Sequence, residues 1–577
     1  MRYGRAIRRT GMAGRHGVAR VAAALAALTC AWLTAAAAWA GPGPEGLKLL
    51  SDEYPRAFYF RRAEALAARE GLSYEDWEST FLLLDGIMGK CLDEELPGRS
   101  RRNIDFFTRY KLAHPDKAVL LHFNGNARDP RFETAPYFAG HWLYYNGCAL
   151  TADLPADAAA TVVHVADPSL FRVGIGRFDD DNDDLAICAL DETGRPDWAR
   201  AEQLALVAVD PAAKTLTVRR GAFGTAPEAF EAGHAHVAAH VTEGPWGQNS
   251  SLLWAYNYAS ACPRDAAGRT CADRLTADLA RWFGPDGPLA AFDGLEFDVL
   301  QFGPFASGPR GRDADADGHA DGGVVDGVNV YGVGVQQFLA QVREALGPGR
   351  LVLADGHSPR HQRGIAYLNG IESEGWPDLS DGWVEDWAGG LNRHRFWQAN
   401  GYAPALSYIN HKHMEAGEPA PLPAGITRLV LAAACFTDSA FTYSLAPPND
   451  GALFGVWDEL CMGAAQQPRW LGRPEGDAIR LAYDTADLLA GAGAAPEAAF
   501  AARCEAQGGR VSVDAGRRAL CITGAPAGAA PGAGCVRVRL PDIDAPAGDI
   551  LVRCTLTATP RAAYGPGVPR LIWVGWQ

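Results

Sequence analysis

The sequence predicts an α/β protein, a (β/α)₈ TIM barrel that carries a small inserted β-domain and a C-terminal β-module. Short, nearly continuous apolar runs alternate with amphipathic helices over most of the chain, as expected of parallel strands buried on both faces. An all-β pattern interrupts this alternation at residues 157–241, and a small-residue linker at 489–496 precedes a β-rich end. Strands that alternate with helices over such a length favour a barrel.

The expected barrel strands are apolar runs bounded by turn residues. They lie at 56–60, 80–86, 118–123, 292–300, 351–355, 369–374, 405–409 and 428–433. Helices are expected at 275–283 and 335–346, because each segment places its apolar residues on one face and is followed by Gly and Pro.

The first forty residues have the pattern of a secretory signal. A basic, acid-free stretch precedes an apolar run at 21–37, which ends in Ala38-Trp39-Ala40. We therefore expect a signal peptide at 1–40 and a secreted or periplasmic protein, although an apolar run of this length also permits a membrane anchor. The barrel is then expected at 41–490, interrupted by the insert at 157–241, and the C-terminal module at 491–577.

Charge and composition exclude several classes of partner. With 48% hydrophobic and 21% charged residues, the chain has the composition of an ordinary globular protein. Loss of the six arginines in the signal segment moves the formal charge from −15 to −21. A surface this acidic repels phosphate backbones and anionic lipid, and we therefore expect no nucleic-acid partner and no membrane-surface partner. Stable membrane insertion is not expected either.

The 12 cysteines suit an oxidising compartment. Cys262 and Cys271 enclose a short polar loop and are the disulfide expected first. Four further cysteines near the C-terminus could supply two more bridges, with a pairing that spacing does not determine: Cys504, Cys521, Cys535 and Cys554.

The strongest chemical signal is the segment 292–300. Alternation along a strand points Leu295 and Phe297 to one face and Glu296 and Asp298 to the other, toward the barrel axis. Barrel enzymes carry their chemistry at the carboxyl ends of strands, which is where Asp298 lies, with Glu296 one layer deeper. The alternative is a buried acidic pair that has a structural role only.

A second pair of carboxylates, Glu372 and Glu374, shares one face of a later strand end, and the aromatic Trp376 follows. Hydrolysis of an acetal needs one carboxyl group that protonates the leaving oxygen and another that attacks or activates water. The predicted catalytic residues are therefore Asp298 and Glu374, with Glu372 as a further candidate. Trp376 is the side chain on which a sugar ring could stack.

Other polar residues recur at the expected strand ends and predict a substrate cleft. Together with Glu296 and Trp376, the candidate substrate-binding residues are Asp85, His122, Asn124, Asp355, His357 and His411. Each of them alone is more often structural than functional.

These motifs resemble those of uncharacterised glycosyl-hydrolase-like TIM-barrel families, whose fourth strand reads D-G-hydrophobic-x-hydrophobic-D. The resemblance rests on residues 293–298 and 369–374 and on the late segments 457–459 and 470–474, and it covers roughly residues 50–480. The chain is also similar to retaining α-galactosidase-type barrels, which implies a nucleophilic Asp on strand four and an acid on strand six. The chitinase pattern is only partly met, because Leu300 stands where its catalytic Glu is expected.

The segment after this strand copies most of a calcium-binding loop. Asp313, Asp315, Asp317 and Asp321 alternate around Gly318 at the sharp turn, which predicts a structural Ca²⁺ site. Position twelve of the loop is Val324 in place of the usual Glu, so a solvated acidic turn is the alternative.

The sequence thus predicts an exported glycoside hydrolase that acts on a poly- or oligosaccharide. A catalytically inactive barrel that binds carbohydrate is the second hypothesis. A metal-dependent hydrolase of another bond is the third, with His122, His357 and His411 as ligands. Both β-modules are expected to be dispensable for the chemistry and to help capture the substrate.

Overall fold

The computed structural model describes most of the chain between residues 51 and 474 and four short strands beyond it. The described ranges are 51–56, 58–60, 63, 67, 71–82, 84–92, 100–130, 137–175, 181–244, 252–306, 308, 310–356, 359–374, 376, 384–411, 414–415, 418–419, 424–443, 469–474, 505–507, 509–514, 519–524 and 537–539. The predicted signal segment 1–40, His357 and the segment 457–459 lie outside these ranges.

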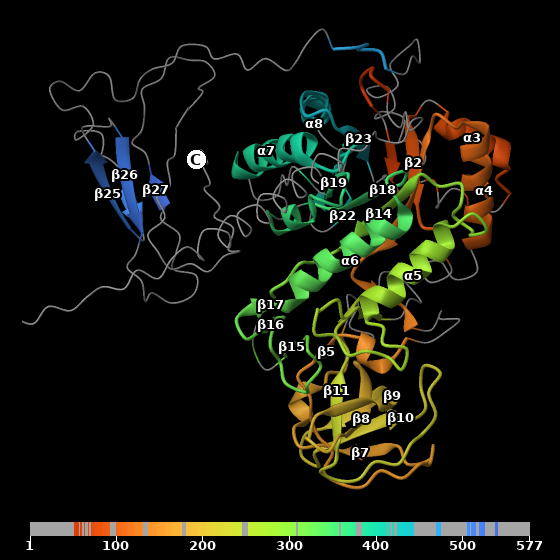
Figure 1. The fold of residues 1–577 in the computed structure, drawn as a ribbon, viewed down its shortest axis with the longest axis vertical. Coiled ribbons are helices and arrows are strands. Elements are labelled where there is room, and N and C mark those ends of the chain that lie inside the picture. Colours follow the sequence, from red (N-terminus) through yellow and green to blue (C-terminus); the bar gives the residue numbers. More distant parts are fainter. Residues whose placement is uncertain are drawn as a thin grey trace, which may run out of the picture. The chain divides into compact units, whose positions relative to one another are not determined.

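The main feature is a curled, parallel, eight-stranded sheet whose strands follow one another in chain order (Figure 1). Its strands are β1 (Phe58–Phe60), β2 (Gly86–Gly89), β3 (Ala118–Asn124), β14 (Gly294–Asp298), β18 (Leu351–Asp355), β19 (Gly370–Glu374), β20 (Tyr408–His411) and β23 (Ala440–Tyr443). One backbone hydrogen bond, from Phe441 N to Arg56 O at 3.0 Å, joins the last strand to the segment that leads into the first.

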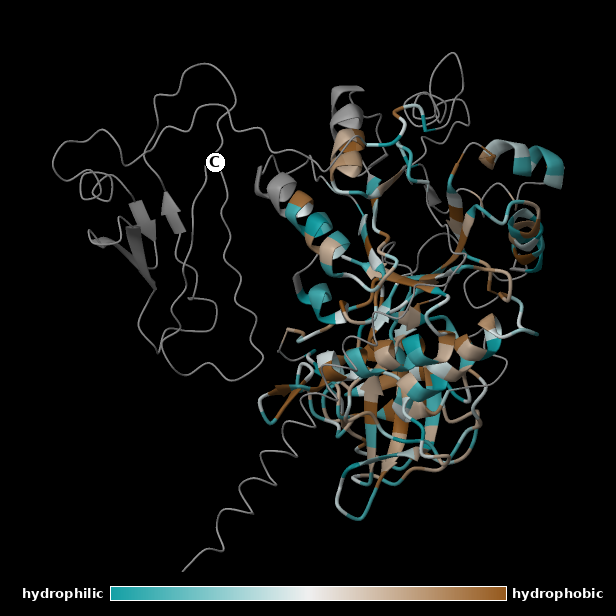
Figure 2. Ribbon diagram, turned by 45° about the horizontal axis from the view of Figure 1, so that its top comes forward, coloured by the Kyte–Doolittle hydropathy of each residue, from teal (hydrophilic) through white to brown (hydrophobic). Residues whose placement is uncertain are grey.

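Helices connect these strands and cover the outside of the sheet. They are α3 (Tyr74–Phe81), α4 (Ser100–Ala113), α5 (Cys271–Phe283), α6 (Val330–Leu346), the 3-10 helix η4 (Pro359–Gly364), α7 (Val384–Asn400) and α8 (Ala424–Phe436). Helix α5 begins in a capping box, in which Thr270 accepts from Asp273 N while the Asp273 carboxylate accepts from Thr270 N. In Figure 2 most strands are hydrophobic, whereas the helices carry bands of both kinds.

Strand parity divides the core into two layers. Leu295 and Phe297 of β14 point outward and pack with apolar residues of α5 and α6, such as Phe338, whose ring centroid lies 5.4 Å from that of Phe297. A smaller apolar cluster fills the inside of the curled sheet: Met88, Ala118, Leu120, Leu351, Leu353, Leu406, Tyr408 and Ala440. The side chains on the inner face nearer the carboxyl ends of the strands are polar.

The long connection from β3 to α5 contains a six-stranded antiparallel sheet, which Figure 1 shows below α5 and α6. In spatial order its strands are β6 (Cys148–Ala149), β11 (Ala235–Ala239), β8 (Asp184–Leu190), β9 (Pro196–Asp210), β10 (Thr215–Arg219) and β7 (Val162–His164). One face of this sheet has its own apolar core, and residues of the other face, including Trp198, belong to the main core. The inserted sheet therefore includes residues before Asp157 and packs against the body of the protein.

Shorter elements complete this part of the chain. They are β4 (Ala127–Arg128), η2 (Ala139–His141), β5 (Tyr144–Tyr145), η3 (Pro168–Leu170), β12 (Thr242–Glu243), β13 (Leu253–Ala255), β15 (Arg312–Asp313), β16 (Val324–Val325), β17 (Val328–Asn329), β21 (Met414–Glu415) and β22 (Glu418–Pro419). No helix among the described residues is both long and apolar enough to cross a membrane.

The chain divides into two compact units, with the boundary after Pro474. The second unit, Glu475–Trp573, contains two antiparallel strand pairs. One pair is β25 (Gly509–Asp514) with β26 (Ala519–Gly524), and the other is β24 (Glu505–Gln507) with β27 (Arg537–Arg539).

Two expected strands and one expected disulfide are wrong. Residues 80–84 contain the end of α3, and the second strand starts only at Gly86; residues 428–433 lie inside α8, and the last strand is β23. Cys262 and Cys271 form no disulfide: both side chains are buried, and burial raises the pKa of the Cys262 thiol to about 12. Packing against apolar neighbours encloses these two sulfurs without a covalent link.

Candidate functional site

The site lies at the carboxyl ends of the central strands and begins with β14 and its neighbour β3. Glu296 pairs in register with His122, and Asp298 pairs with Asn124. His122 Nδ1 lies 2.7 Å from Glu296 Oε2, and His122 Nε2 lies 3.2 Å from Asp298 Oδ2. The side chains of His122 and Glu296 are fully buried, whereas that of Asp298 is 23% exposed. The imidazole thus connects a buried carboxylate to one that solvent can reach.

Two further buried carboxylates complete the deep layer. Asp355, at the end of β18, pairs in register with Glu372 of β19. Glu296, Asp355 and Glu372 are 0%, 3% and 1% exposed, and one carboxylate oxygen of each lies within 4.8 Å of the others. Three acids at this depth cost several kcal/mol of solvation per ionised group unless protons, donors or a cation compensate them.

Hydrogen bonds hold two of these acids in place. Glu372 accepts the Tyr408 hydroxyl at 2.8 Å and the Asn410 amide at 2.6 Å. Asp355 Oδ2 accepts the backbone N–H of Val299 at 2.8 Å. Val299 directly follows Asp298 and has φ 54°, a left-handed conformation that is unusual for a β-branched residue. Such strain is often found at functional sites, where the surrounding contacts maintain it.

Electrostatics distinguish the buried layer from the strand ends above it. Burial raises the pKa of Glu296 well above its usual value, and the Glu372, Asp298 and Asp355 carboxylates raise it further. Both effects favour the protonated form of Glu296, because its charged form is desolvated by burial and repelled by the neighbouring carboxylates.

Glu374, which is partly exposed, lies one step further along β19 and pairs in register with Asn410. The sequence therefore predicts correctly that Glu374 lies at the end of a strand of the parallel sheet. Trp376 is only 3% exposed, and its ring centroid lies 5.9 Å from that of the buried His394. Its indole consequently packs within the protein. His411 ends β20, where its backbone pairs with Tyr443.

Asp85 lies away from this group. Because β2 starts at Gly86, Asp85 is at the amino end of its strand, whereas Asp298 is at the carboxyl end of β14. Asp85 is 2% exposed and forms an ion pair with Arg469 at 2.7 Å. The error in the predicted strand placed this side chain at the wrong edge of the sheet.

Glu243 belongs to the site but has no signal in the sequence. It lies on β12, where the chain returns from the inserted sheet, and its carboxylate accepts hydrogen bonds from Asn124 and, at 3.0 Å, from Asn126. Burial raises the pKa of Glu243, the two asparagine side chains lower it, and Asp298 raises it again. Only tertiary contacts place this residue beside the end of β3.

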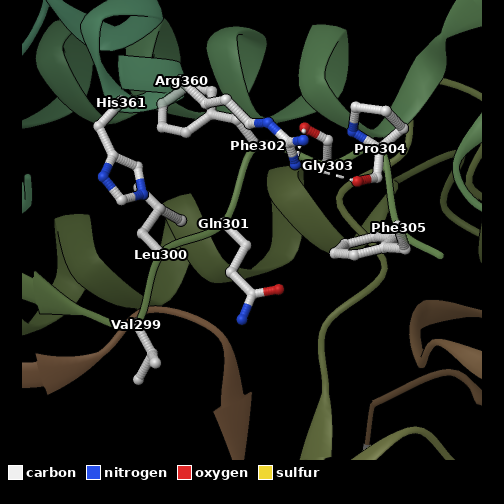
Figure 3. A pocket seen from close by; sticks show the side chains of 9 residues that line it. All are labelled: Val299, Leu300, Gln301, Phe302, Gly303, Pro304, Phe305, Arg360 and His361. Atoms are coloured by element: carbon white, nitrogen blue, oxygen red, sulfur yellow. Dashed lines mark hydrogen bonds between the residues drawn. The ribbon is translucent and has the colours of Figure 1, made fainter. Parts of the chain in front are cut away.

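A pocket of about 230 Å³ opens directly after β14 (Figure 3). Residues 299–305 line it together with Arg360 and His361 of η4. Arg360 donates to the carbonyl oxygens of Gly303 and Pro304 at 3.4 and 3.2 Å, which fixes the guanidinium group at the rim. This pocket therefore lies next to the strand end that carries Asp298.

The acidic loop after β14 folds into a compact turn. Asp313, Asp315 and Asp317 each bring one carboxylate oxygen within 4.8 Å of the other two, while Asp321 Oδ2 accepts the backbone N–H of Asp315 at 3.1 Å. Burial raises the pKa of Asp313 to about 8, and the neighbouring aspartates contribute. Arg195 approaches Asp315 and Asp317 at 3.5 and 3.6 Å. All three carboxylates could hold one cation, with Asp321 bracing the turn.

Comparison with known proteins finds distant similarities among solved structures. No protein family and no curated protein matches the sequence. Among solved structures, the chain is similar to isomalto-dextranase from Arthrobacter globiformis T6 in complex with panose, with 13% identity, a TM-score of 0.31 and coverage of 71% of this chain and 56% of that one. It is also similar to sucrose 6F-phosphate phosphorylase from Thermoanaerobacter thermosaccharolyticum, with 10% identity, a TM-score of 0.28 and coverage of 73% of this chain and 81% of that one. A third similar structure is pyruvate kinase from Pyrobaculum aerophilum, with 10% identity, a TM-score of 0.29 and coverage of 70% of each chain. Similarities at this level assign no function.

Proposed function

We propose that this chain is an exported glycoside hydrolase that acts on a poly- or oligosaccharide, with Asp298 and Glu374 as its acid–base pair. The observation that carries the proposal is the pair of partly exposed carboxylates at the carboxyl ends of β14 and β19, above a layer of buried acids. Glycosidic bond cleavage requires two carboxyl groups on opposite sides of the bond. The same end of a barrel carries the chemistry in enzymes of this architecture.

Burial favours this pair over the deeper one. Glu296 and Glu372 are 0% and 1% exposed, so a sugar cannot reach them. Strands β14 and β19 are separated by β18, which places their main chains roughly 10 Å apart at the usual strand spacing. The carboxyl groups of Asp298 and Glu374 therefore have to point toward one another. Only then does their separation fall within the range of retaining and inverting glycosidases, which is at most about 9.5 Å.

Glu243 is a second candidate for the acid. Its burial and the charge of Asp298 favour the protonated form, and the end of β3 lies beside the end of β14. A general acid must hold its proton near the working pH, and a raised pKa serves this need. The variants Glu243→Gln and Glu374→Gln distinguish the two assignments.

The wider architecture is part of the proposal. We take the curled sheet to close into a complete barrel, supported by the hydrogen bond between Phe441 and Arg56. The segment 1–40 is assigned as a cleaved signal peptide, the barrel as 41–490 with its insert at 157–241, and the remainder as a β-module. The acidic loop is assigned a structural Ca²⁺ bound by Asp313, Asp315 and Asp317, whose carboxylate oxygens suit a hard cation.

A glycan-hydrolysis screen of the wild type and Asp298→Asn tests the function. Loss of a general acid or base usually costs about 10²–10⁴-fold in rate, and we expect a loss of this size. The matched control is Asp286→Asn, an equivalent change at an exposed position before the amino end of β14, which should keep full activity. Glycan binding without turnover in the wild type would refute hydrolysis and identify a carbohydrate-binding barrel.

A further inference from the structure

The pocket after β14 is positively charged, although the molecule as a whole is acidic. None of the nine residues that line it is acidic, and Arg360 holds its guanidinium group at the rim. The whole chain, in contrast, has 68 acidic residues against 53 lysines and arginines. A local excess of positive charge beside the strand end that carries Asp298 favours an anionic ligand there.

A second arginine, Arg312 of β15, packs against one wall of this pocket. Its guanidinium carbon lies 3.7 Å from the ring centroid of Phe305, and its Nη1 donates to Gln301 Oε1 at 3.4 Å. Gln301 and Phe305 both line the pocket (Figure 3). An aromatic face attracts a cation at this distance, so the ring and the amide together fix the guanidinium group at the pocket wall.

Within the described part of the chain, the guanidinium group of Arg312 donates to the Gln301 amide and forms no direct ion pair. Burial lowers the pKa of Arg312, and Glu243, which acts on it without direct contact, raises it. An arginine stays charged in proteins, so this is a desolvated cation that lacks a contacting anion. Its nitrogen atoms that do not bond to Gln301 keep some contact with solvent and can therefore donate to a ligand.

We propose that this pocket binds one sugar residue that carries an anionic substituent, a carboxylate or a sulfate ester, and that Arg312 is its charge partner. The planar fork of a guanidinium group suits the oxygens of such an anion. The volume of about 230 Å³ is smaller than the ~300–1,000 Å³ of pockets for drug-sized ligands, and it therefore suits a single sugar unit. As a statement about the substrate, the inference rests on the proposed hydrolase function.

The charges around the pocket favour one anionic sugar over a long polyanion. The formal charge of the chain is −15, and the Glu243 carboxylate interacts electrostatically with both Asp298 and Arg312. An anionic sugar is repelled by these acids unless a cation lies at the place where it binds, and Arg312 supplies that cation. The alternative is that Arg312 only offsets the charge of Glu243, in which case anionic sugars have no advantage over neutral ones.

Saturation-transfer NMR with the full-length chain tests the proposal. The probes are glucuronate, galacturonate and glucose 6-sulfate, each compared with glucose or galactose at millimolar concentration. We expect at least one anionic sugar to bind about ten-fold more tightly than its neutral counterpart, because a hydrogen bond between charged groups is the stronger kind. Arg312→Met should remove this preference. The matched control is Arg200→Met, the same change at an exposed position of β9, which should keep it.

Two results would overturn the inference: no preference of the wild type for any of the anionic sugars, and the same preference in Arg312→Met as in the wild type. Arg312→Gln repeats the test if Arg312→Met does not fold, because the new amide can still donate to Gln301. Binding of the uronates alone or of the sulfate alone identifies the substituent. None of the probes contains a glycosidic bond, so failure of the hydrolase proposal leaves the outcome of this assay unaffected.

Discussion

The inserted sheet contains a buried ion pair whose removal has a calculable cost. Arg220 donates to both carboxylate oxygens of Glu202 at 2.7 Å, and both side chains are fully buried. The same guanidinium group donates to the carbonyl oxygens of Pro155 and Glu228. Arg220→Met leaves Glu202 as a buried carboxylate with only backbone donors, from Gly221 and Glu228. Breaking a buried pair on one side costs about 3–5 kcal/mol.

This loss is a large part of the stability of a small domain, which is about 5–15 kcal/mol. We therefore expect Arg220→Met to open the inserted sheet and leave the barrel folded. Hydrogen exchange of peptides from β8 to β10 should rise strongly, while peptides from β3 and β14 should change little. The double variant Arg220→Met/Glu202→Leu should regain most of the protection, because an apolar replacement of both partners is often neutral.

Two outcomes would refute this reasoning. Unchanged exchange in β8 to β10 would show that the ion pair contributes little to stability. Equal loss of protection in the barrel would show that the insert and the barrel unfold as one unit, as the shared packing of Trp198 in the main core permits. In that case the insert is not dispensable, contrary to the expectation from sequence.

Three further predictions concern cations and pH. Ca²⁺ should raise the melting temperature of the wild type through ligand linkage and have a smaller effect on Asp315→Asn; equal shifts would contradict the loop site. Burial raises the pKa of Asp184 to about 7, and Trp254 Nε1 donates a hydrogen bond to its carboxylate at 2.7 Å. The tryptophan fluorescence should therefore change with a midpoint near pH 7, and this change should be absent in Asp184→Asn. Stability from this group is lost as the pH rises through that value, because the native state holds a proton that the unfolded chain has already released. If Glu243 is the acid, activity should fall as the pH rises through its raised pKa, and Glu243→Gln should lose about 10²–10⁴-fold in kcat; an unchanged profile would favour Glu374.

Local pattern was sufficient where only one secondary structure fits an apolar run. The strand at 351–355 has the bounds that the sequence predicts. The sequence also predicts the inward direction of Glu296 and Asp298 and the turn that ends α6. Residues 428–433 were mistaken for a strand because a buried helix and a buried strand both appear as continuous apolar sequence. The error at 80–86 had the same origin and moved Asp85 to the wrong edge of the sheet.

The sequence by itself determined the strand–helix alternation, the insert and the inner face of β14, because side-chain periodicity is a local property of the backbone. Only the tertiary structure decided which acids meet. Register between parallel strands brought Asp355 opposite Glu372 and both close to Glu296, and the return from the insert brought Glu243 to the end of β3. These contacts join residues far apart in the chain, and burial then sets their charge, so no local pattern encodes them.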